Sequence, residues 1–212
     1  MSKGPPTNKS ALMATGVGGV LADGDFIVGT AFFISDESLL TCAHVVAAAG
    51  GGTANIGDVV RVRLTHFEPP VDVEAEVVCL NSQPQNDIAL LKLRRPARRP
   101  AGVAKLPLRS GVSIDDHEFK ATGYPEGAWG SALTKGEIQG EAAAGGFLLR
   151  NVDVAVPIVP GFSGAPIWDI EEGVDAVVGL VSNNFAKRGA DGSGVAVQRI
   201  TGLCPGAQQA ET

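Results

Sequence analysis

The chain has 212 residues, 44% of them hydrophobic and 19% charged, with 28 glycines. This length suits one large all-β domain or two small ones with a buried core, and the composition excludes a fibrous or disordered protein. The formal net charge of −6 disfavours nucleic acid and anionic membranes as partners, and no apolar run reaches the roughly 20 residues needed to cross a bilayer.

Residues 1–20 contain no continuous apolar stretch before a cleavage site, so we expect no secretory signal. Short segments rich in Val, Ile and Leu then recur between Gly, Pro, Asn and Asp, and several alternate apolar and polar residues as half-buried strands do. Only His44–Ala49, which ends at three glycines, predicts a helix. The sequence therefore predicts an all-β protein whose sheets form barrels or a sandwich. The main expected strands are Phe26–Ile34, Val59–Leu64, Val71–Leu80, Ile88–Leu93, Phe147–Val156, Ala176–Val181 and Val195–Ile200.

The first residue that suggests chemistry is His44, where an apolar strand gives way to the short helix. A histidine in such a place is more often a packed core residue than a base. Asp87 comes directly before the strand Ile88–Leu93. Such a carboxylate usually caps a turn, but it could also fix the tautomer of an imidazole. We interpret His66 and His117, which lie in polar stretches, as surface loop residues.

A basic, proline-rich stretch, Arg94–Pro100, separates two groups of expected strands. We interpret it as a solvated linker and not as a phosphate-binding patch, because prolines forbid a helix and no aromatics interleave. We expect residues 1–95 to form a first domain, 96–112 a linker, 113–204 a second domain and 205–212 a flexible tail.

The segment Gly161–Pro166 places a serine between two glycines, which make a tight turn that exposes the hydroxyl of Ser163. Acyl transfer needs a nucleophilic oxygen activated by a base, with amide donors beside it for the oxyanion. The N–H groups of Gly161 and Ser163 are the candidate donors. An ordinary Gly–Ser turn is the alternative. The order His44, Asp87, Ser163 favours a catalytic triad.

Three cysteines, Cys42, Cys79 and Cys204, are an odd number without metal-ligand spacing. We therefore expect no metal and no cofactor. Because secreted proteins usually pair their cysteines, this usage predicts a cytoplasmic location.

These blocks resemble the trypsin-like (chymotrypsin-fold) serine peptidases, especially the bacterial branch that includes the HtrA-type proteases. The resemblance implies two six-stranded antiparallel β-barrels with the active site between them, the first carrying His44 and Asp87 and the second Ser163. It also implies a serine endopeptidase that cleaves protein or peptide substrates, with His44 as base and the amides of Gly161 and Ser163 as oxyanion hole. The matching blocks are 29–34, 40–46, 86–93, 121–125, 134–138, 161–166, 179–182 and 194–197.

The chain also departs from the family pattern. Phe162 stands where secreted members carry an Asp that pairs with a new N-terminal amine, so activation by clipping is not expected. Val45 replaces the cysteine of the histidine-loop disulfide, and Ala165 replaces a glycine. No acidic residue follows Asp153 in the segment expected to form the specificity pocket, which implies an uncharged residue at P1, the substrate position before the cut bond. The residues expected to bind substrate are Pro157, Ser182, Asn183, Asn184 and Gly194.

Three alternatives stay open. A catalytically silent member of this fold would act as a binding module. A protease effector module of a larger signalling or defence protein would be fused to, or regulated by, other domains. An esterase is disfavoured, because its triad usually runs Ser, Asp, His on a strand-to-helix elbow.

Overall fold

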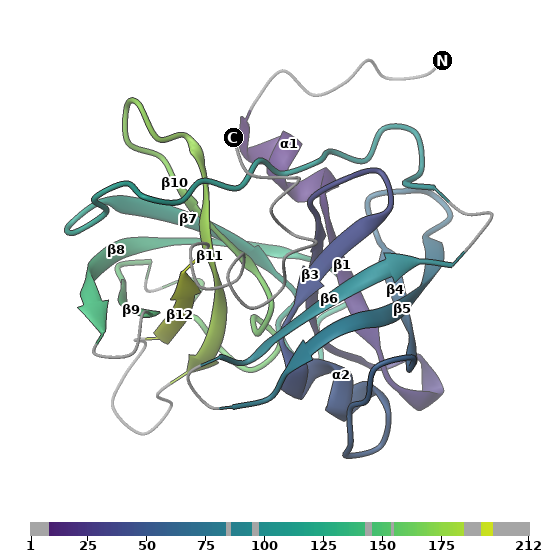
Figure 1. Cartoon of the computed structure of the whole chain (residues 1–212). Coiled ribbons are helices and arrows are strands. Elements are labelled where there is room, and N and C mark those ends of the chain that lie inside the picture. The colour runs from purple at the N-terminus through teal and green to yellow at the C-terminus, as the bar shows by residue number, and fades with distance from the viewer. Residues whose placement is uncertain are drawn as a thin grey trace.

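Two six-stranded rings, side by side, make up the molecule (Figure 1). The computed structural model describes residues 9–83, 86–94, 98–142, 146–153, 155–184 and 192–196. Every pairing between the named strands is antiparallel. The all-β, two-barrel fold expected from the sequence is confirmed.

The first barrel closes in the order β1-β2-β3-β6-β5-β4. In β5, Val73, Ala75 and Val77 are buried while the intervening acidic residues are exposed, because alternate side chains of a strand point to opposite faces. The same alternation in the sequence identified this strand. The bounds of the six strands are β1 Val17–Leu21, β2 Ile27–Phe33, β3 Ser38–Thr41, β4 Val59–Leu64, β5 Val71–Asn81 and β6 Ile88–Leu93.

Two α-helices and one 3₁₀ turn accompany these strands. The expected helix is present as α2, Ala43–Ala49, and its end is closed by the Gly50 N–H, which donates to the Val46 carbonyl. The sequence did not predict α1, Lys9–Thr15, or the turn η1, Asp23–Asp25.

The second barrel closes in the order β10-β11-β12-β9-β8-β7. The expected strand Phe147–Val156 ends earlier, at Asn151. Of the expected strand Val195–Ile200, residues 197–200 lie outside the described part of the chain. The bounds are β7 Glu118–Gly123, β8 Ala132–Ala142, β9 Gly146–Asn151, β10 Pro166–Asp169, β11 Ala176–Asn184 and β12 Gly192–Ala196.

The segment between β6 and β7 crosses from one barrel to the other and packs on both (Figure 1). The Leu106 N–H donates to the Phe33 carbonyl in β2, and the Val177 N–H in β11 donates to the Pro107 carbonyl. Within the basic stretch, Arg99 bonds the Asp36 carboxylate at 2.7 Å, so this part is less free than the expected solvated linker. The domain limits at residues 95, 113 and 204 stay predictions, and the expected tail lies outside the described residues.

The cysteines differ from the expectation. Cys79 is disulfide-bonded, Cys42 is a free, buried thiol, and Cys204 lies outside the described residues. Because disulfides persist mainly in oxidising compartments, the bond at Cys79 removes the cysteine argument for a cytoplasmic location. No helix among the described residues is long and apolar enough to cross a membrane.

Candidate active site

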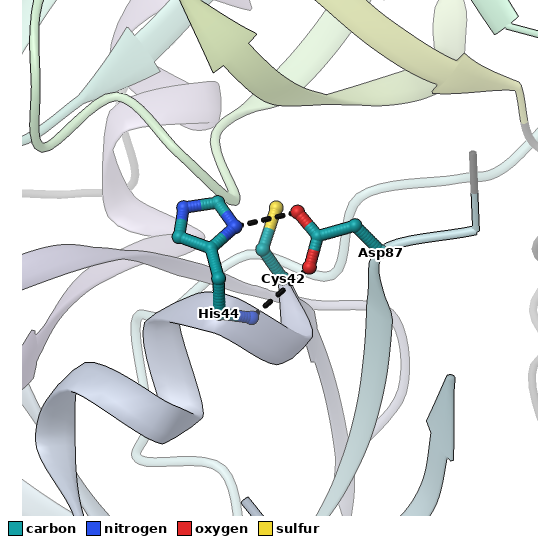
Figure 2. A group of neighbouring side chains, drawn as sticks. All are labelled: Cys42, His44 and Asp87. Atoms are coloured by element: carbon teal, nitrogen blue, oxygen red, sulfur yellow. Dashed lines mark hydrogen bonds and ion pairs between the residues drawn. The ribbon is translucent and has the colours of Figure 1, made fainter. Parts of the chain in front are cut away.

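His44 and Asp87 meet because the strands next to them are paired. His44 is the second residue of α2, just after β3, and Asp87 directly precedes β6. The two strands run antiparallel with Thr41 opposite Ala89, which brings the end of β3 to the start of β6. The Nδ1 atom of His44 lies 2.5 Å from Oδ2 of Asp87, and the backbone N–H of His44 donates to Oδ1 at 3.0 Å (Figure 2).

The carboxylate of Asp87 is buried and accepts a third hydrogen bond, from Ser182 Oγ at 2.8 Å. Burial alone would raise the pKa of Asp87, but the hydrogen bonds from His44 and Ser182 and the charge of His44 together hold this pKa below its usual value. An ionised carboxylate can only accept, so in the neutral form of His44 the proton lies on Nδ1 and Nε2 is left as an acceptor. A base for a hydroxyl needs this tautomer.

Cys42 lies beside this pair, and its sulfur could in principle join the two as a metal ligand (Figure 2). The ligand atoms of Cys42, His44 and Asp87 all lie within 4.8 Å of one another. A zinc ion about 2.0–2.1 Å from both N and O would hold those two atoms roughly 3.3 Å apart. The observed 2.5 Å between Nδ1 and Oδ2 is shorter than this and fits a direct hydrogen bond between the two side chains. The Cys42 thiol donates instead to the Val181 carbonyl at 3.2 Å, and burial raises its pKa well above the usual value.

Ser163 lies in a turn of the second barrel that faces this pair. The Gly164 N–H donates to the Val181 carbonyl and the Val181 N–H to the Ala165 carbonyl, so the turn is fixed to β11 just before Ser182. Ser163 Oγ lies 3.4 Å from the Ser182 carbonyl oxygen, a long hydrogen bond. No hydrogen bond joins Ser163 to His44 among the described residues. Ser182 therefore connects the two sides: its hydroxyl contacts Asp87 and its carbonyl contacts Ser163.

The carbonyls of the peptide groups that carry the Gly161 and Ser163 N–H are both hydrogen-bonded to other backbone amides. The Pro160 carbonyl accepts from the Glu126 N–H at 2.8 Å, and the Phe162 carbonyl accepts from the Ala165 N–H at 2.8 Å. Because a trans peptide is planar, the N–H of the following residue points opposite to each carbonyl. Neither the Gly161 nor the Ser163 N–H has an acceptor among the described residues. These two donors are available to an anion.

Only glycine fits at position 161. Its φ of 97° is in the left-handed region. A Cβ there would lie 2.0 Å from the Tyr124 carbonyl oxygen and 2.7 Å from the Glu126 nitrogen. Phe162, the departure noted above, is fully buried in the second barrel's core and packs over Gly123. The aromatic ring thus anchors the turn between the two amides by packing.

The residues expected to bind substrate are spread around the second barrel. Ser182 is buried, and Pro157 is half-buried in the segment before the serine turn. Asn183 and Asn184 continue β11 opposite β12, in which Gly194 pairs with Val181. The contact of Ser182 with Asp87 was missed, because no local pattern marks two partners 95 positions apart in sequence.

A cavity of about 540 Å³ is lined by the His44–Asp87 pair together with other residues of the first barrel. Apart from His44 and Asp87, its walls are small or uncharged side chains from α2 and from the loops around residues 52–55 and 82. None of the five expected substrate-binding residues is among those that line it, so sequence reasoning missed this cavity. The lining residues are Ala43, His44, Ala47, Gly52, Thr53, Ala54, Asn55, Ser82 and Asp87.

The other two histidines lie away from this site. His66 is exposed beside Phe67, as expected for a loop residue, and partial burial lowers its pKa. His117 was expected in a surface loop, but its Nδ1 lies 2.7 Å from Oδ2 of the fully buried Asp169. His117 does lie in a loop, just before β7, and is half-buried; its pairing with Asp169 was not expected from the sequence.

Comparison with known proteins agrees with this geometry. Residues 29–180 match the family model of the trypsin-like peptidase domain, whereas no curated protein matches the chain. Three crystal structures of Rv3671c from M. tuberculosis share the fold at 20% sequence identity. The inactive form of a serine-to-alanine mutant has a TM-score of 0.68, and the match covers 99% of this chain and 97% of that chain. The inactive and active forms of the protease both have a TM-score of 0.67; the match covers 98% of this chain and 98% of that chain for the inactive form, and 96% and 87% for the active form. Because the family model spans most of the sequence, this chain belongs to the trypsin-like peptidase domain family and is a serine peptidase by that membership.

Proposed function

We propose that this protein is a serine endopeptidase in which His44, Asp87 and Ser163 form the catalytic triad. One observation carries the proposal. The Asp87 carboxylate holds the His44 imidazole at 2.5 Å in the tautomer of a base, and Ser182 links that carboxylate to the Ser163 hydroxyl. The partner implied is a protein or peptide substrate.

In the proposed reaction, Ser163 Oγ turns from the Ser182 carbonyl toward Nε2 of His44 when substrate binds. Catalytic hydrogen bonds that are long without substrate often tighten in the complex. His44 takes the hydroxyl proton as Ser163 attacks the scissile carbonyl, and then gives that proton to the leaving amine. Asp87 stabilises the imidazolium formed in between. Water hydrolyses the acyl-enzyme by the same steps in reverse.

The free amides of Gly161 and Ser163 support the second half of the proposal, an oxyanion hole. The tetrahedral intermediate carries a negative oxygen, and donors fixed in advance stabilise it without reorganisation. The turn is fixed on both sides, by the Glu126 N–H at the Pro160 carbonyl and by β11 at Gly164 and Ala165.

For specificity we propose a small-to-medium, uncharged P1 residue, with Pro157, Ser182, Asn183, Asn184 and Gly194 as the pocket. The absence of an acidic residue from Ala155 to Phe162 supports this. A library of peptides that varies P1 measures it by mass spectrometry of the cut sites. Dominant cleavage after Arg or Lys would contradict the pocket assignment and leave the triad untouched.

The triad is tested by labelling with a fluorophosphonate, which reacts only with an activated serine. Wild-type protein is expected to be labelled and to cleave a casein substrate. Ser163→Ala and His44→Ala should lose both properties, whereas Ser113→Ala, at an exposed serine outside the site, should keep them. An unlabelled, inactive wild type would favour the silent binding module. The cytoplasmic location stays a prediction, against which the disulfide at Cys79 counts.

A further inference from the structure

Thr30 of β2 is a fully buried polar residue of the first barrel that reaches the serine turn of the second barrel. Its side chain and backbone make four hydrogen bonds, three of them to the other barrel. Burying a hydroxyl costs free energy unless hydrogen bonds compensate, and Thr30 is 0% exposed. The partners of Thr30 therefore indicate what this residue holds in place.

The hydroxyl connects two backbone segments that surround the candidate oxyanion hole. Thr30 Oγ1 donates to the Gly161 carbonyl at 2.8 Å and accepts from the Tyr124 N–H at 3.1 Å. Tyr124 begins the loop whose Glu126 N–H holds the Pro160 carbonyl at 2.8 Å. Both peptide groups that flank Gly161 are thus held from outside, one by Thr30 directly and one by the loop that Thr30 fixes.

The backbone of Thr30 holds the nucleophile residue itself. Its N–H donates to the Ser163 carbonyl at 2.8 Å, and its own carbonyl accepts from Thr41 Oγ1 at 2.6 Å. The fit is close, because a Cβ at Gly164 would lie 2.0 Å from the Thr30 carbonyl oxygen. One residue of the first barrel therefore contacts the serine turn on both sides of Phe162.

The peptide groups on either side of Gly161 need hydrogen bonds from outside the turn to fix their orientation. The close approach of Tyr124 requires glycine there, yet glycine is also the residue whose flanking peptides rotate most freely. If the peptide before Gly161 rotated, its N–H would turn away and one of the two free donors would be lost. Nothing in the local sequence of the turn prevents that rotation.

We propose that Thr30 is a positioning residue that keeps the Gly161 N–H directed into the active site, so that its hydroxyl supports catalysis without touching substrate. The inference rests on the proposed function, because it concerns the same oxyanion hole. It adds a residue of the first barrel to a feature otherwise built from the second.

The test compares two buried threonines. Thr30→Val keeps the shape and the backbone N–H but removes the hydroxyl, and Thr30→Ser keeps the hydroxyl. The matched control is Thr122→Val, because Thr122 is also buried but its hydroxyl has no partner among the described residues. Loss of one oxyanion donor costs about 10²–10³ in kcat, and we expect Thr30→Val to lower kcat by about 10- to 100-fold with KM nearly unchanged. Thr30→Ser should stay within about threefold of wild type, and Thr122→Val should equal wild type.

A second measurement separates a positioning role from general damage. Affinity for a peptide boronate, whose tetrahedral oxygen occupies the oxyanion hole, should fall with kcat in Thr30→Val, while the thermal midpoint shows whether the variant is folded. If Thr30→Val does not fold, kcat and the boronate affinity are measured on Thr30→Ala instead. An unchanged kcat in a folded variant, or a Thr30→Ser as impaired as Thr30→Val, would overturn the inference. An inactive wild type would instead overturn the proposed function.

Discussion

The molecule contains two His–Asp pairs that differ in what surrounds them. In the first barrel Nδ1 of His44 lies 2.5 Å from Asp87, and in the second Nδ1 of His117 lies 2.7 Å from Asp169. The Asp87 carboxylate also binds the Ser182 hydroxyl, whereas Asp169 accepts the Glu171 backbone N–H at 2.9 Å and so closes a turn. A His–Asp pair can therefore serve structure alone, and the link through Ser182 to the Ser163 hydroxyl is what distinguishes the candidate catalytic pair.

The largest expected difference comes from removing each histidine. We expect His44→Ala to lower kcat on the order of 10⁴-fold or more, because no base remains for Ser163. His117→Ala should keep kcat and KM but lower the thermal midpoint, because Asp169 stays buried without its partner, at a cost of about 1–3 kcal/mol. Peptide hydrolysis and thermal melts measure both. Equal losses of activity would contradict the assignment of His44 as the base.

The two carboxylates provide the next comparison. Asp87→Asn preserves shape but presents an amide N–H that favours the wrong tautomer of His44, so we expect about a 10⁴-fold lower kcat. Asp169→Asn should leave kcat within about twofold, since an amide oxygen can still accept from Glu171. Hydrolysis rates at neutral pH, corrected for folded protein, decide between them. A fully active Asp87→Asn would remove Asp87 from the triad.

A smaller effect is expected from Ser182→Ala, which removes one of the three hydrogen bonds to Asp87. We expect kcat to fall about tenfold, because a hydrogen bond to a charged group contributes roughly 1.5–3 kcal/mol.

In Ser182→Ala the lowered pKa of Asp87 should also move back toward its usual value. Ionised Asp87 stabilises the fold above the unfolded-state pKa, and this stability is lost as pH falls through the folded-state pKa. Acid unfolding of Ser182→Ala should therefore begin at a higher pH, as circular dichroism between about pH 2.5 and 5 would show; an unchanged onset would contradict this.

The smallest effect concerns His66, the histidine that makes no ion pair with a carboxylate among the described residues. Burial lowers its pKa below the ordinary histidine value of about 6.5. The unfolded chain therefore binds the proton more readily than the folded one, and stability should decrease as pH falls below about 6.5. His66→Phe, which can keep the contact with Phe67, should slightly reduce this dependence of stability on pH. Thermal midpoints at about pH 5 and 7.5 measure the slope, and an identical slope in the variant would assign it to other groups.

The sequence predicted several strands of the first barrel well: β4 and β6 have the expected bounds, and β5 differs by one residue. In β4 and β5 the alternation of side chains is a local property that the sequence carries directly, whereas β6 reads as a short continuous apolar run. The three triad candidates were also found from local blocks. The proximity of His44 to Asp87 follows from strand pairing between β3 and β6, which is non-local.

What the sequence did not predict depends on contacts between distant segments. Thr30, Ser182 and the His117–Asp169 pair all have partners far away in the chain, so no spacing rule identifies them. The cavity beside His44 is lined mostly by small side chains, and no sequence motif marks a place where large side chains are missing. The disulfide at Cys79 was missed because an odd number of cysteines was taken to indicate a reducing compartment.

The segment between β6 and β7 has a consequence for how the molecule unfolds. Leu106 and Leu108 are buried in the same core as the first barrel, while hydrogen bonds on either side of Leu108 reach Val177 in the second barrel. Neither barrel can unfold without exposing this connecting segment, which both barrels bury. The protein should therefore melt in one cooperative transition, and the two halves expressed apart should not fold independently.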